Sequence, residues 1–213
     1  AYHPGQYLEL ALKDGTRRCY SMATAHAEQG VELHVRRMPG GKFSGHVFDD
    51  LKAKDVLRLE GPLGTFFLRE DAGKPIILLA SGTGFAPIKA MIEQMQRKEI
   101  DVPASLYWGC RSKADLYLHE WAIRASEALP NLRYVPVLSE PRSEDAWTGR
   151  TGLVHQAVIE DFPNLSEHQV YACGAPIMVE SAKKAFAEWC ALPSDEFHAD
   201  SFVANHVQVS EPA

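Results

Sequence analysis

The feature that most constrains this chain is a change in the spacing of its hydrophobic residues near residue 72. Before that point, apolar and polar side chains alternate along residues 31–36, and shorter alternating runs occupy residues 7–12 and 56–60. A period of two is typical of antiparallel strands with one buried face. Turns rich in glycine, proline and aspartate separate the runs. The first part of the chain therefore predicts a small antiparallel β-barrel.

The second part begins with an apolar run at residues 76–80, as expected of a parallel strand covered on both faces. Ile88, Met91, Ile92 and Met95 follow at the spacing of one helix face. Strand-like and helix-like segments then alternate, which predicts an α/β doubly wound parallel sheet with ligands beyond the carboxyl ends of its strands. The further strands are expected at residues 105–108, 133–138 and 169–172, and the further helices at 116–128, 154–162 and 177–192.

The length of 213 residues fits two compact domains. We expect the antiparallel barrel in residues 1–72, the α/β domain in residues 73–204 and a tail in residues 205–213. With 46% hydrophobic and 23% charged residues, the composition is typical of a globular protein. The net charge of −6 argues against a nucleic-acid partner or an anionic membrane surface, which favour basic proteins. No apolar run reaches the roughly 20 residues of a membrane helix.

The four cysteines are scattered along the chain, at Cys19, Cys110, Cys173 and Cys190. Their spacing fits neither a disulfide framework nor a metal or iron–sulfur ligand set, so no metal site is expected. Isolated thiols suit a reducing compartment, and we expect a cytoplasmic protein. The chain starts without methionine, inside an expected strand, which indicates that further sequence precedes Ala1.

A glycine-rich turn joins the apolar strand at residues 76–80 to its helix. It contains Gly82, Thr83 and Gly84, and Pro87 stands in the first helical turn. Glycines at this place let backbone N–H groups approach a phosphate, and a helix N-terminus attracts negative charge. The third glycine of the dinucleotide fingerprint is missing, so the turn alone is equally consistent with a tight β–α connection without a ligand.

A second segment of interest ends the expected strand at residues 169–172. Cys173, Gly174 and Pro176 follow it directly, where a doubly wound sheet exposes its strand ends. A small thiol followed by glycine would let a planar ring approach closely. A packed, inert thiol is the alternative, because cysteine is among the most buried residue types.

The first domain offers two further candidates. Residues 17–21 supply a guanidinium, an aromatic ring and a hydroxyl at Arg18, Tyr20 and Ser21, and arginine suits phosphate because its planar fork binds two oxygens. Residues 38–44 join a glycine turn to a short apolar helical stretch, which is a possible anion site. The alternatives are a strand that alternates between solvent and core, and a hairpin turn before a capped helix.

The order and spacing of these motifs resemble the ferredoxin–NADP⁺ reductase superfamily. Gly-Pro-x-Gly at residues 61–64 and Gly-Cys-Arg-Ser at residues 109–112 complete the set. Within the superfamily, the chain is most similar to the bacterial NADH-dependent reductase components of oxygenases and to CDP-6-deoxy-Δ3,4-glucoseen reductase. The resemblance extends from Pro4 to Phe202. The superfamily barrel usually has a strand before Pro4, so the resemblance implies an open or incomplete barrel here.

The resemblance implies a flavin site in the first domain. Arg18 would hold a flavin phosphate, Tyr20 would stack on one face of the isoalloxazine ring, and Ser21 would hydrogen-bond the flavin N5 that receives hydride. The ribityl chain and ring edge would be lined by His34, Val35 and Arg36. The pyrophosphate would be cradled by Gly41, Lys42, Phe43 and Ser44, which favours FAD over FMN.

The resemblance also implies a nicotinamide dinucleotide site in the second domain, for NADH or NADPH. Phe202 would cover the second flavin face as a movable lid. Cys173 and Gly174 would contact the nicotinamide, next to Pro176, and Arg111 would contact the adenosine end, next to Gly109. The dinucleotide itself would lie on Gly82, Thr83, Gly84 and Pro87.

As a whole, the resemblance implies an NAD(P)H-dependent flavoprotein that passes single electrons to an iron–sulfur protein or to a ferredoxin domain upstream in the same protein. The chain itself contains no Cys-x4-Cys-x2-Cys spacing, so the acceptor lies outside these residues. Two alternatives remain open. One is a flavin reductase that binds flavin as a dissociable substrate, and the other is a non-catalytic subunit that senses nucleotides with the same fold.

Overall fold

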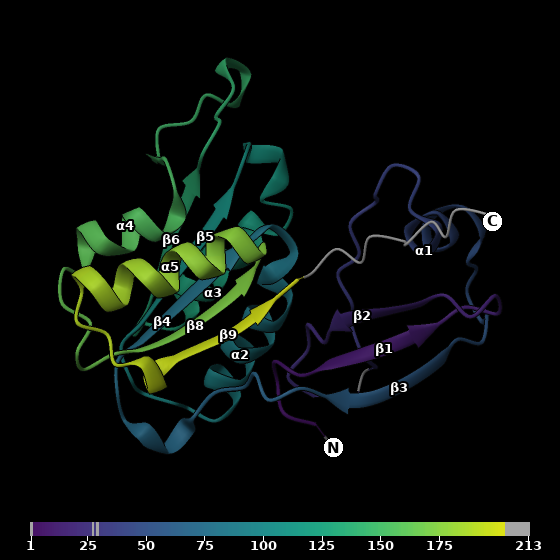
Figure 1. Cartoon of the computed structure of the whole chain (residues 1–213), viewed down its shortest axis with the longest axis horizontal. Coiled ribbons are helices and arrows are strands. Elements are labelled where there is room, and N and C mark those ends of the chain that lie inside the picture. The colour runs from purple at the N-terminus through teal and green to yellow at the C-terminus, as the bar shows by residue number, and fades with distance from the viewer. Residues whose placement is uncertain (1, 27, 29, 203–213) are drawn as a thin grey trace, which may run out of the picture.

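The computed structural model of the chain describes residues 2–26, 28 and 30–202. Two sheets lie side by side in it, a small one formed by the first part of the chain and a large one formed by the rest (Figure 1). The predicted tail at residues 205–213 lies outside the described residues. No described helix is long and apolar enough to cross a membrane.

The first domain is an antiparallel sheet, as predicted, and its strand order is β2-β1-β3 within the described residues. Leu8 and Leu10 project from the central strand into a buried position, so one face of the sheet is covered. The described residues form an open three-stranded sheet, and the expected absence of a first barrel strand stays a prediction. Its strands are β1 (Tyr7–Ala11), β2 (Arg17–Ser21) and β3 (Arg58–Leu63).

The strand predicted at residues 31–36 is wrong. Among the described residues, the segment pairs with a neighbouring segment through a single bridge, between Met22 and Leu33. Its polar side chains explain the difference, because Glu32 and His34 turn to the second domain and hydrogen-bond residues there. Glu32 and His34 therefore contact the other domain, and the alternation of residues 31–36 does not mark a strand in a sheet.

The turn at residues 38–41 leads into helical structure, as the glycine pattern indicates. The helix α1 (Lys42–Gly45) begins directly after Gly41 and continues into a wider helical turn at His46–Asp50. Phe43 and Ser44 are its buried residues. This helix stands beside β2, since the Phe43 ring packs against Tyr20.

The second domain is the predicted doubly wound parallel sheet. Its strand order is β7-β6-β5-β4-β8-β9, and each of its neighbouring pairs is parallel. The apolar run at residues 76–80 forms β4 (Ile76–Ser81) in the middle of the sheet, with five fully buried residues. The other strands are β5 (Ala104–Cys110), β6 (Leu132–Leu138), β7 (Arg150–Thr151), β8 (Gln169–Gly174) and β9 (Phe197–Ser201).

Helices cover both faces of this sheet and produce two hydrophobic clusters. One face packs on α2 (Phe85–Arg97) and α3 (His119–Ala128), and the other packs on α4 (Val154–Asp161) and α5 (Pro176–Trp189). Ile88, Met91, Ile92 and Met95 all lie in the first cluster, as their spacing predicts. The α2 face of the sheet is also the side from which Phe66 and Leu68, in the connection between the domains, enter the core.

Some boundaries differ from the sequence prediction for local reasons. The helix expected from Leu116 begins at His119, because Ser112 and Asp115 close a separate turn by reciprocal hydrogen bonds. The edge strands β7 and β9 were not predicted; β7 is short, and the residues of β9 carry no uniform apolar pattern. The division between domains at residue 72 stays a prediction, since β3 ends at Leu63 and β4 begins at Ile76.

Candidate active site at the domain interface

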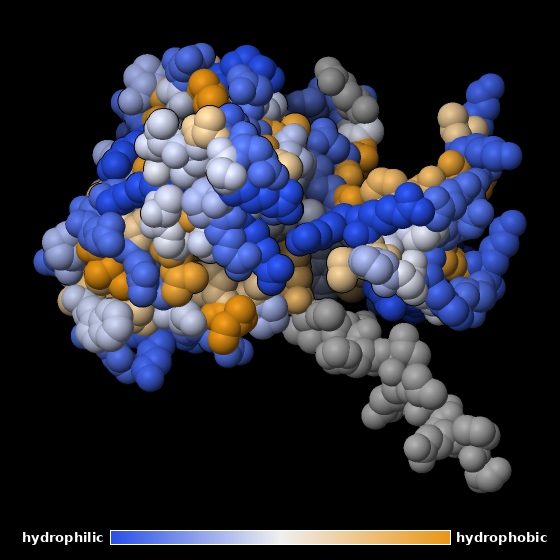
Figure 2. Space-filling model, turned by 90° about the horizontal axis from the view of Figure 1, so that it is seen from above, coloured by the Kyte–Doolittle hydropathy of each residue, from blue (hydrophilic) through white to orange (hydrophobic). Residues whose placement is uncertain are grey.

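A cleft of about 370 Å³ lies between the two domains at the carboxyl ends of the parallel strands. Its position agrees with the rule that doubly wound sheets bind ligands at this edge. Seen from above, the smaller domain stands beside the larger one, and the surface is mostly hydrophilic (Figure 2). Residues of both domains line the cleft: His34, Val35 and Arg36 from the first, and Gly82, Thr83, Ala114, Asp115 and Tyr117 from the second.

Ser21 ends β2 with its side chain buried, and its Oγ has no hydrogen-bond partner among the described residues. The carboxyl of Asp200 lies near this hydroxyl. Burial raises the pKa of Asp200, and the nearby Ser21 hydroxyl opposes that rise. A buried hydroxyl without a partner loses the hydrogen bonds that water would supply, so this atom is suited to an external polar group.

Asp200 brings a second predicted residue into the same group, because it pairs in register with Cys173 across β8 and β9. Cys173 is fully buried, and burial raises the pKa of its thiol well above the ordinary value. The group is therefore a neutral thiol at neutral pH and not a nucleophilic thiolate.

The two glycine turns predicted separately meet at this edge. A side chain at Gly84 would collide with the backbone of Cys173, since an added Cβ would stand 2.1 Å from its carbonyl oxygen. Gly174 has φ of +139° and stands against Ser81, whose Oγ accepts the N–H of Ala175 at 3.0 Å. The glycines at 84 and 174 thus allow the two turns to pack together. Gly82 is different, because no atom lies within 4 Å of its missing side chain and it faces the cleft.

Arg18 and Tyr20 lie on one face of β2. The Arg18 guanidinium donates to the carbonyl of its neighbour Arg17 at 2.7 Å, which leaves most of its donors available. The Tyr20 ring is half-buried against Phe43, with ring centroids 5.2 Å apart. Burial raises the pKa of Tyr20 and the charge of Arg18 opposes that rise, so the two side chains are close in space.

The turn at residues 38–44 is held by the hydroxyl of Ser44. Its Oγ accepts the N–H of Met38 at 3.1 Å and approaches the carbonyl of Gly41 at 3.2 Å. A Cβ on Gly41 would stand 2.7 Å from this hydroxyl, so the turn requires glycine there. Lys42 extends to the surface and lies 3.7 Å from Asp14. Residues 38–44 thus form a compact turn with a buried internal hydroxyl, and their role as a pyrophosphate cradle stays a prediction.

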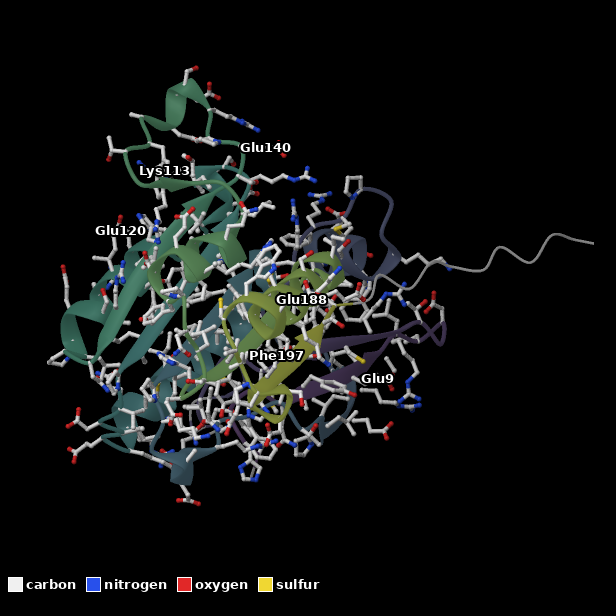
Figure 3. All side chains as sticks on the ribbon, turned by 60° about the vertical axis from the view of Figure 1, so that its left-hand side comes forward. Glu9, Lys113, Glu120, Glu140, Glu188 and Phe197 are labelled. Carbon is white, nitrogen blue, oxygen red and sulfur yellow. The ribbon has the colours of Figure 1, made fainter. Side chains whose placement is uncertain are left out.

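The predicted adenosine end lies where β5 and β6 finish. Arg111 is exposed, and its carbonyl accepts the N–H of Glu140 at 2.9 Å. Lys113 and Glu140 stand at the same end of the molecule (Figure 3). Gly109 lies in β5 and packs closely against α4, because a Cβ added to it would stand 2.7 Å from the Cβ of Val154. Its glycine therefore has a packing reason that is independent of any ligand.

Phe202 follows β9 and is tied to the turn after β8, since its N–H donates to the carbonyl of Gly174 at 2.8 Å. The ring is partly buried against the cluster that contains Cys173. Pro176 starts α5 at the position where proline is favoured, because a first-turn N–H has no helical acceptor. Phe202, Cys173 and Pro176 therefore lie at one edge of the sheet, and Phe202 is placed to cover it.

Besides Ala114 and Asp115 on the cleft wall, sequence reasoning missed two residues of this site. Asp200 belongs to no sequence motif named above. The pairing of β9 with β8 places it beside Cys173. Tyr117 is the other, and its hydroxyl contacts His34 Nδ1 at 2.6 Å on the wall of the cleft. The tertiary contact between domains that brings Tyr117 to the cleft has no local sequence signature.

The described residues fit a flavin dinucleotide. The buried Oγ of Ser21 lacks a partner, Arg18 has free donors on the same strand, and a glycine turn with an ordered hydroxyl stands next to them. No group of three or more His, Cys, Asp or Glu side chains that could hold a metal ion occurs in the part of the chain that the structure describes. The Ser21 hydroxyl and the Arg18 guanidinium are donors suited to a ring nitrogen and a phosphate.

Comparison with known proteins agrees with this geometry. The family model for the oxidoreductase FAD-binding domain matches residues 1–68, and that for the oxidoreductase NAD-binding domain matches residues 78–184. CDP-6-deoxy-L-threo-D-glycero-4-hexulose-3-dehydrase reductase of Yersinia pestis is 45% identical over 206 residues, which cover 95% of this chain and 60% of that protein. Reductase component 2 of terephthalate 1,2-dioxygenase from Comamonas is 38% identical, with 94% of this chain and 59% of that protein covered.

Among solved structures, the cytochrome P450 reductase GcoB of Amycolatopsis superimposes with a TM-score of 0.86 at 37% identity, over 95% of this chain and 61% of that one. The chain thus spans about three fifths of the length of the relatives that it matches. The two adjacent family matches agree with the observed antiparallel and parallel sheets and with the cleft between them. The chain belongs to the ferredoxin reductase family, with an FAD-binding domain followed by an NAD-binding domain.

Proposed function

We propose that this chain is the reductase part of an electron-transfer protein that oxidises NADH or NADPH and delivers single electrons to an iron–sulfur acceptor. Bound FAD would supply the chemistry, since it accepts hydride and releases electrons one at a time. The reductases named above for a sugar dehydrase and a dioxygenase support this proposal. The acceptor, as a separate protein or as a further domain, lies outside the residues described here.

The observation that carries the proposal is the buried hydroxyl of Ser21, which lacks a partner at the edge where Cys173 and Asp200 meet. Ser21 would donate its proton to a ring nitrogen of the flavin and fix the ring at that edge. Arg18 would bind a phosphate and Tyr20 would stack on the ring. These roles require a retained flavin, which argues against a flavin that comes and goes as substrate.

In the second domain, Gly82 and Thr83 would bind the dinucleotide where they line the cleft, and Cys173 would set the distance of the nicotinamide. Phe202 would occupy the same space until the nicotinamide displaces it. Its hydrogen bond to Gly174 joins the lid to the turn beneath it and supports this placement. Arg111 would bind near the adenosine, with NADH or NADPH as the donor.

The test is Ser21→Ala in the FAD-loaded protein. The change removes one hydroxyl from a buried site where it has no protein partner, so the fold should be little affected. We expect retained FAD, and reduction by NADH slower by about 10- to 100-fold in single-turnover mixing, because a misplaced ring costs rate and not affinity. A variant that retains FAD and is reduced at the parental rate would contradict the role of Ser21.

A further inference from the structure

A lysine is buried where the two domains meet. Lys89 lies on α2, and its side chain is only 6% exposed. Its ammonium donates to the carbonyl of Ala23 at 3.0 Å and to Glu93 at 2.6 Å, and approaches Glu32 at 3.5 Å. It also stands 5.3 Å from the ring of Trp121. Because Ala23 and Glu32 belong to the FAD-binding domain, this one cation bridges both domains.

Glu93 strengthens the same connection. It stands one turn after Lys89 on α2, and while one carboxylate oxygen accepts from Lys89 the other accepts the N–H of Ala25 at 2.9 Å. The segment that directly follows Ser21 is therefore bound to α2 by both its carbonyl and its N–H groups. A buried charge that loses its partners is strongly destabilising, so these contacts hold the segment firmly.

A second arm of the contact runs to the cleft. His34 approaches Glu32 through Nε2 at 2.7 Å and the Tyr117 hydroxyl through Nδ1 at 2.6 Å. Burial lowers the pKa of His34, although the Glu32 carboxylate opposes that shift, so the imidazole is neutral at neutral pH. A neutral imidazole has one donor and one acceptor. Since a carboxylate can only accept, Nε2 donates a hydrogen bond to Glu32, and Nδ1 accepts a hydrogen bond from the Tyr117 hydroxyl.

Glu32 connects the two arms. Burial acts to raise its pKa, but the hydrogen bond from His34 and the charge of Lys89 outweigh it and hold the pKa below its ordinary value. The carboxylate is thus ionised between a buried ammonium and a neutral imidazole. We call the set of Lys89, Glu93, Glu32, His34 and Tyr117 the interdomain clasp.

We propose that Lys89 is a positioning residue for the active site: it fixes the segment after Ser21 and, through Glu32, the His34–Tyr117 pair on the wall of the cleft. The clasp holds the flavin-side wall and the nucleotide-side wall at one separation. Lys89 itself touches no predicted cofactor atom. The part of this inference that concerns hydride transfer rests on the proposed function, whereas the part that concerns the clasp does not.

The experiment compares Lys89→Met with Lys98→Met in the FAD-loaded protein. Lys98 follows the same helix and also pairs with a carboxylate, Glu70 at 2.6 Å, but its side chain is half exposed and far from the cleft. In Lys89→Met we expect amide exchange at Met22–Ala25 to be about tenfold faster or more, because the segment loses its buried anchor. Reduction by NADH should slow by about 10- to 100-fold with near-parental FAD content. Lys98→Met should match the parent in both.

The titration of His34, followed by NMR, separates positioning from a general loss of stability. Tyr117, Glu32, Lys89 and Glu93 are the titratable groups that face the imidazole. Removing the charge of Lys89 should raise the pKa of His34, and Glu32→Gln should lower it further, because the carboxylate is the group that supports the protonated form. The two variants shift one signal in opposite directions.

Glu32→Gln also serves if Lys89→Met fails to fold, since it preserves the shape of the side chain. Unchanged exchange and an unchanged His34 titration in that variant would overturn the clasp. Altered exchange with parental reduction rates would overturn the positioning role. Exchange and titration are measured on the oxidised protein without a hydride donor, so a parent that NADH and NADPH both fail to reduce refutes the proposed function separately.

Discussion

Replacement of Cys173 distinguishes a catalytic contact from a packed thiol. Packing ranks the alanine variant above the serine variant in stability, whereas a catalytic contact ranks the serine variant above the alanine variant in reduction rate. The side chain is fully buried among the residues of the α2 face. Cys173→Ala deletes one heavy atom, comparable to a methylene, and leaves a small cavity, so we expect a loss of about 1 kcal/mol. Cys173→Ser keeps the size but buries a hydroxyl in an apolar cluster, at about 1–3 kcal/mol.

Stability should therefore fall in the order Cys, Ala, Ser, and a loss of about 1 kcal/mol corresponds to roughly 2–4 °C in melting temperature for a chain of this size. If Cys173 sets the distance of the nicotinamide, the order for flavin reduction is Cys, Ser, Ala, since a side chain of similar size preserves the contact. The alanine variant should be slower by about 10- to 100-fold. FAD affinity should stay near parental in both variants.

The assay is stopped-flow reduction by NADH together with a thermal melt on the same preparations. Rates are expressed per bound FAD, so partial loss of cofactor does not imitate a slower reaction. Reduction rates equal to the parent in both variants, with the melting temperatures lowered as above, would show that Cys173 is a structural thiol.

The remaining predictions concern binding and stability. Arg18→Ala should weaken FAD binding by about 1.5–3 kcal/mol, or one to two decades in the dissociation constant by ultrafiltration. The melt of the apoprotein should change little, because among the described residues this side chain hydrogen-bonds the neighbouring Arg17 carbonyl alone; equal affinities would refute the phosphate contact. Phe202→Ala should tighten NAD⁺ or NADP⁺ binding and increase charge-transfer absorbance, because a competing ring worth roughly 0.5–1.5 kcal/mol is removed; weaker binding with an unchanged spectrum would place Phe202 outside the site. Burial raises the pKa of Asp200, so its contribution to stability is greatest below its unfolded pKa and declines as the pH rises through the folded pKa. Asp200→Asn should remove the decline that chemical unfolding shows as the pH rises above about 4, the ordinary pKa of an aspartate, and an unchanged pH slope would contradict it.

Periodicity in the sequence was sufficient for most of the second domain. An apolar run such as residues 76–80 forms a central strand wherever helices cover both faces, and the four apolar positions of α2 lie on the buried face as their spacing requires. The prediction of a strand at residues 31–36 failed for a physical reason. Glu32 and His34 contact the other domain, and local sequence cannot distinguish such a contact from pairing in a sheet.

Turns near the site could be predicted where they depend on local glycine positions. Contacts between segments distant in the sequence could not be predicted. The turns at Gly84 and Gly174 follow from their sequence positions, but their packing against each other depends on the parallel register of β4 and β8. Lys89 was passed over because a lysine next to an apolar helix face ordinarily reaches solvent. Its burial results from the contact between α2 and the FAD-binding domain, which exists only in the folded chain.

The most direct test of the account is anaerobic titration of the FAD-loaded protein with NADH and, separately, with NADPH, followed by the absorbance of the flavin. If the chain is the reductase part of an electron-transfer protein, it retains FAD through gel filtration, and one equivalent of the preferred nucleotide bleaches the flavin band. Retained FAD that neither nucleotide bleaches, even in large excess, would contradict the account and favour a subunit that binds nucleotides without chemistry.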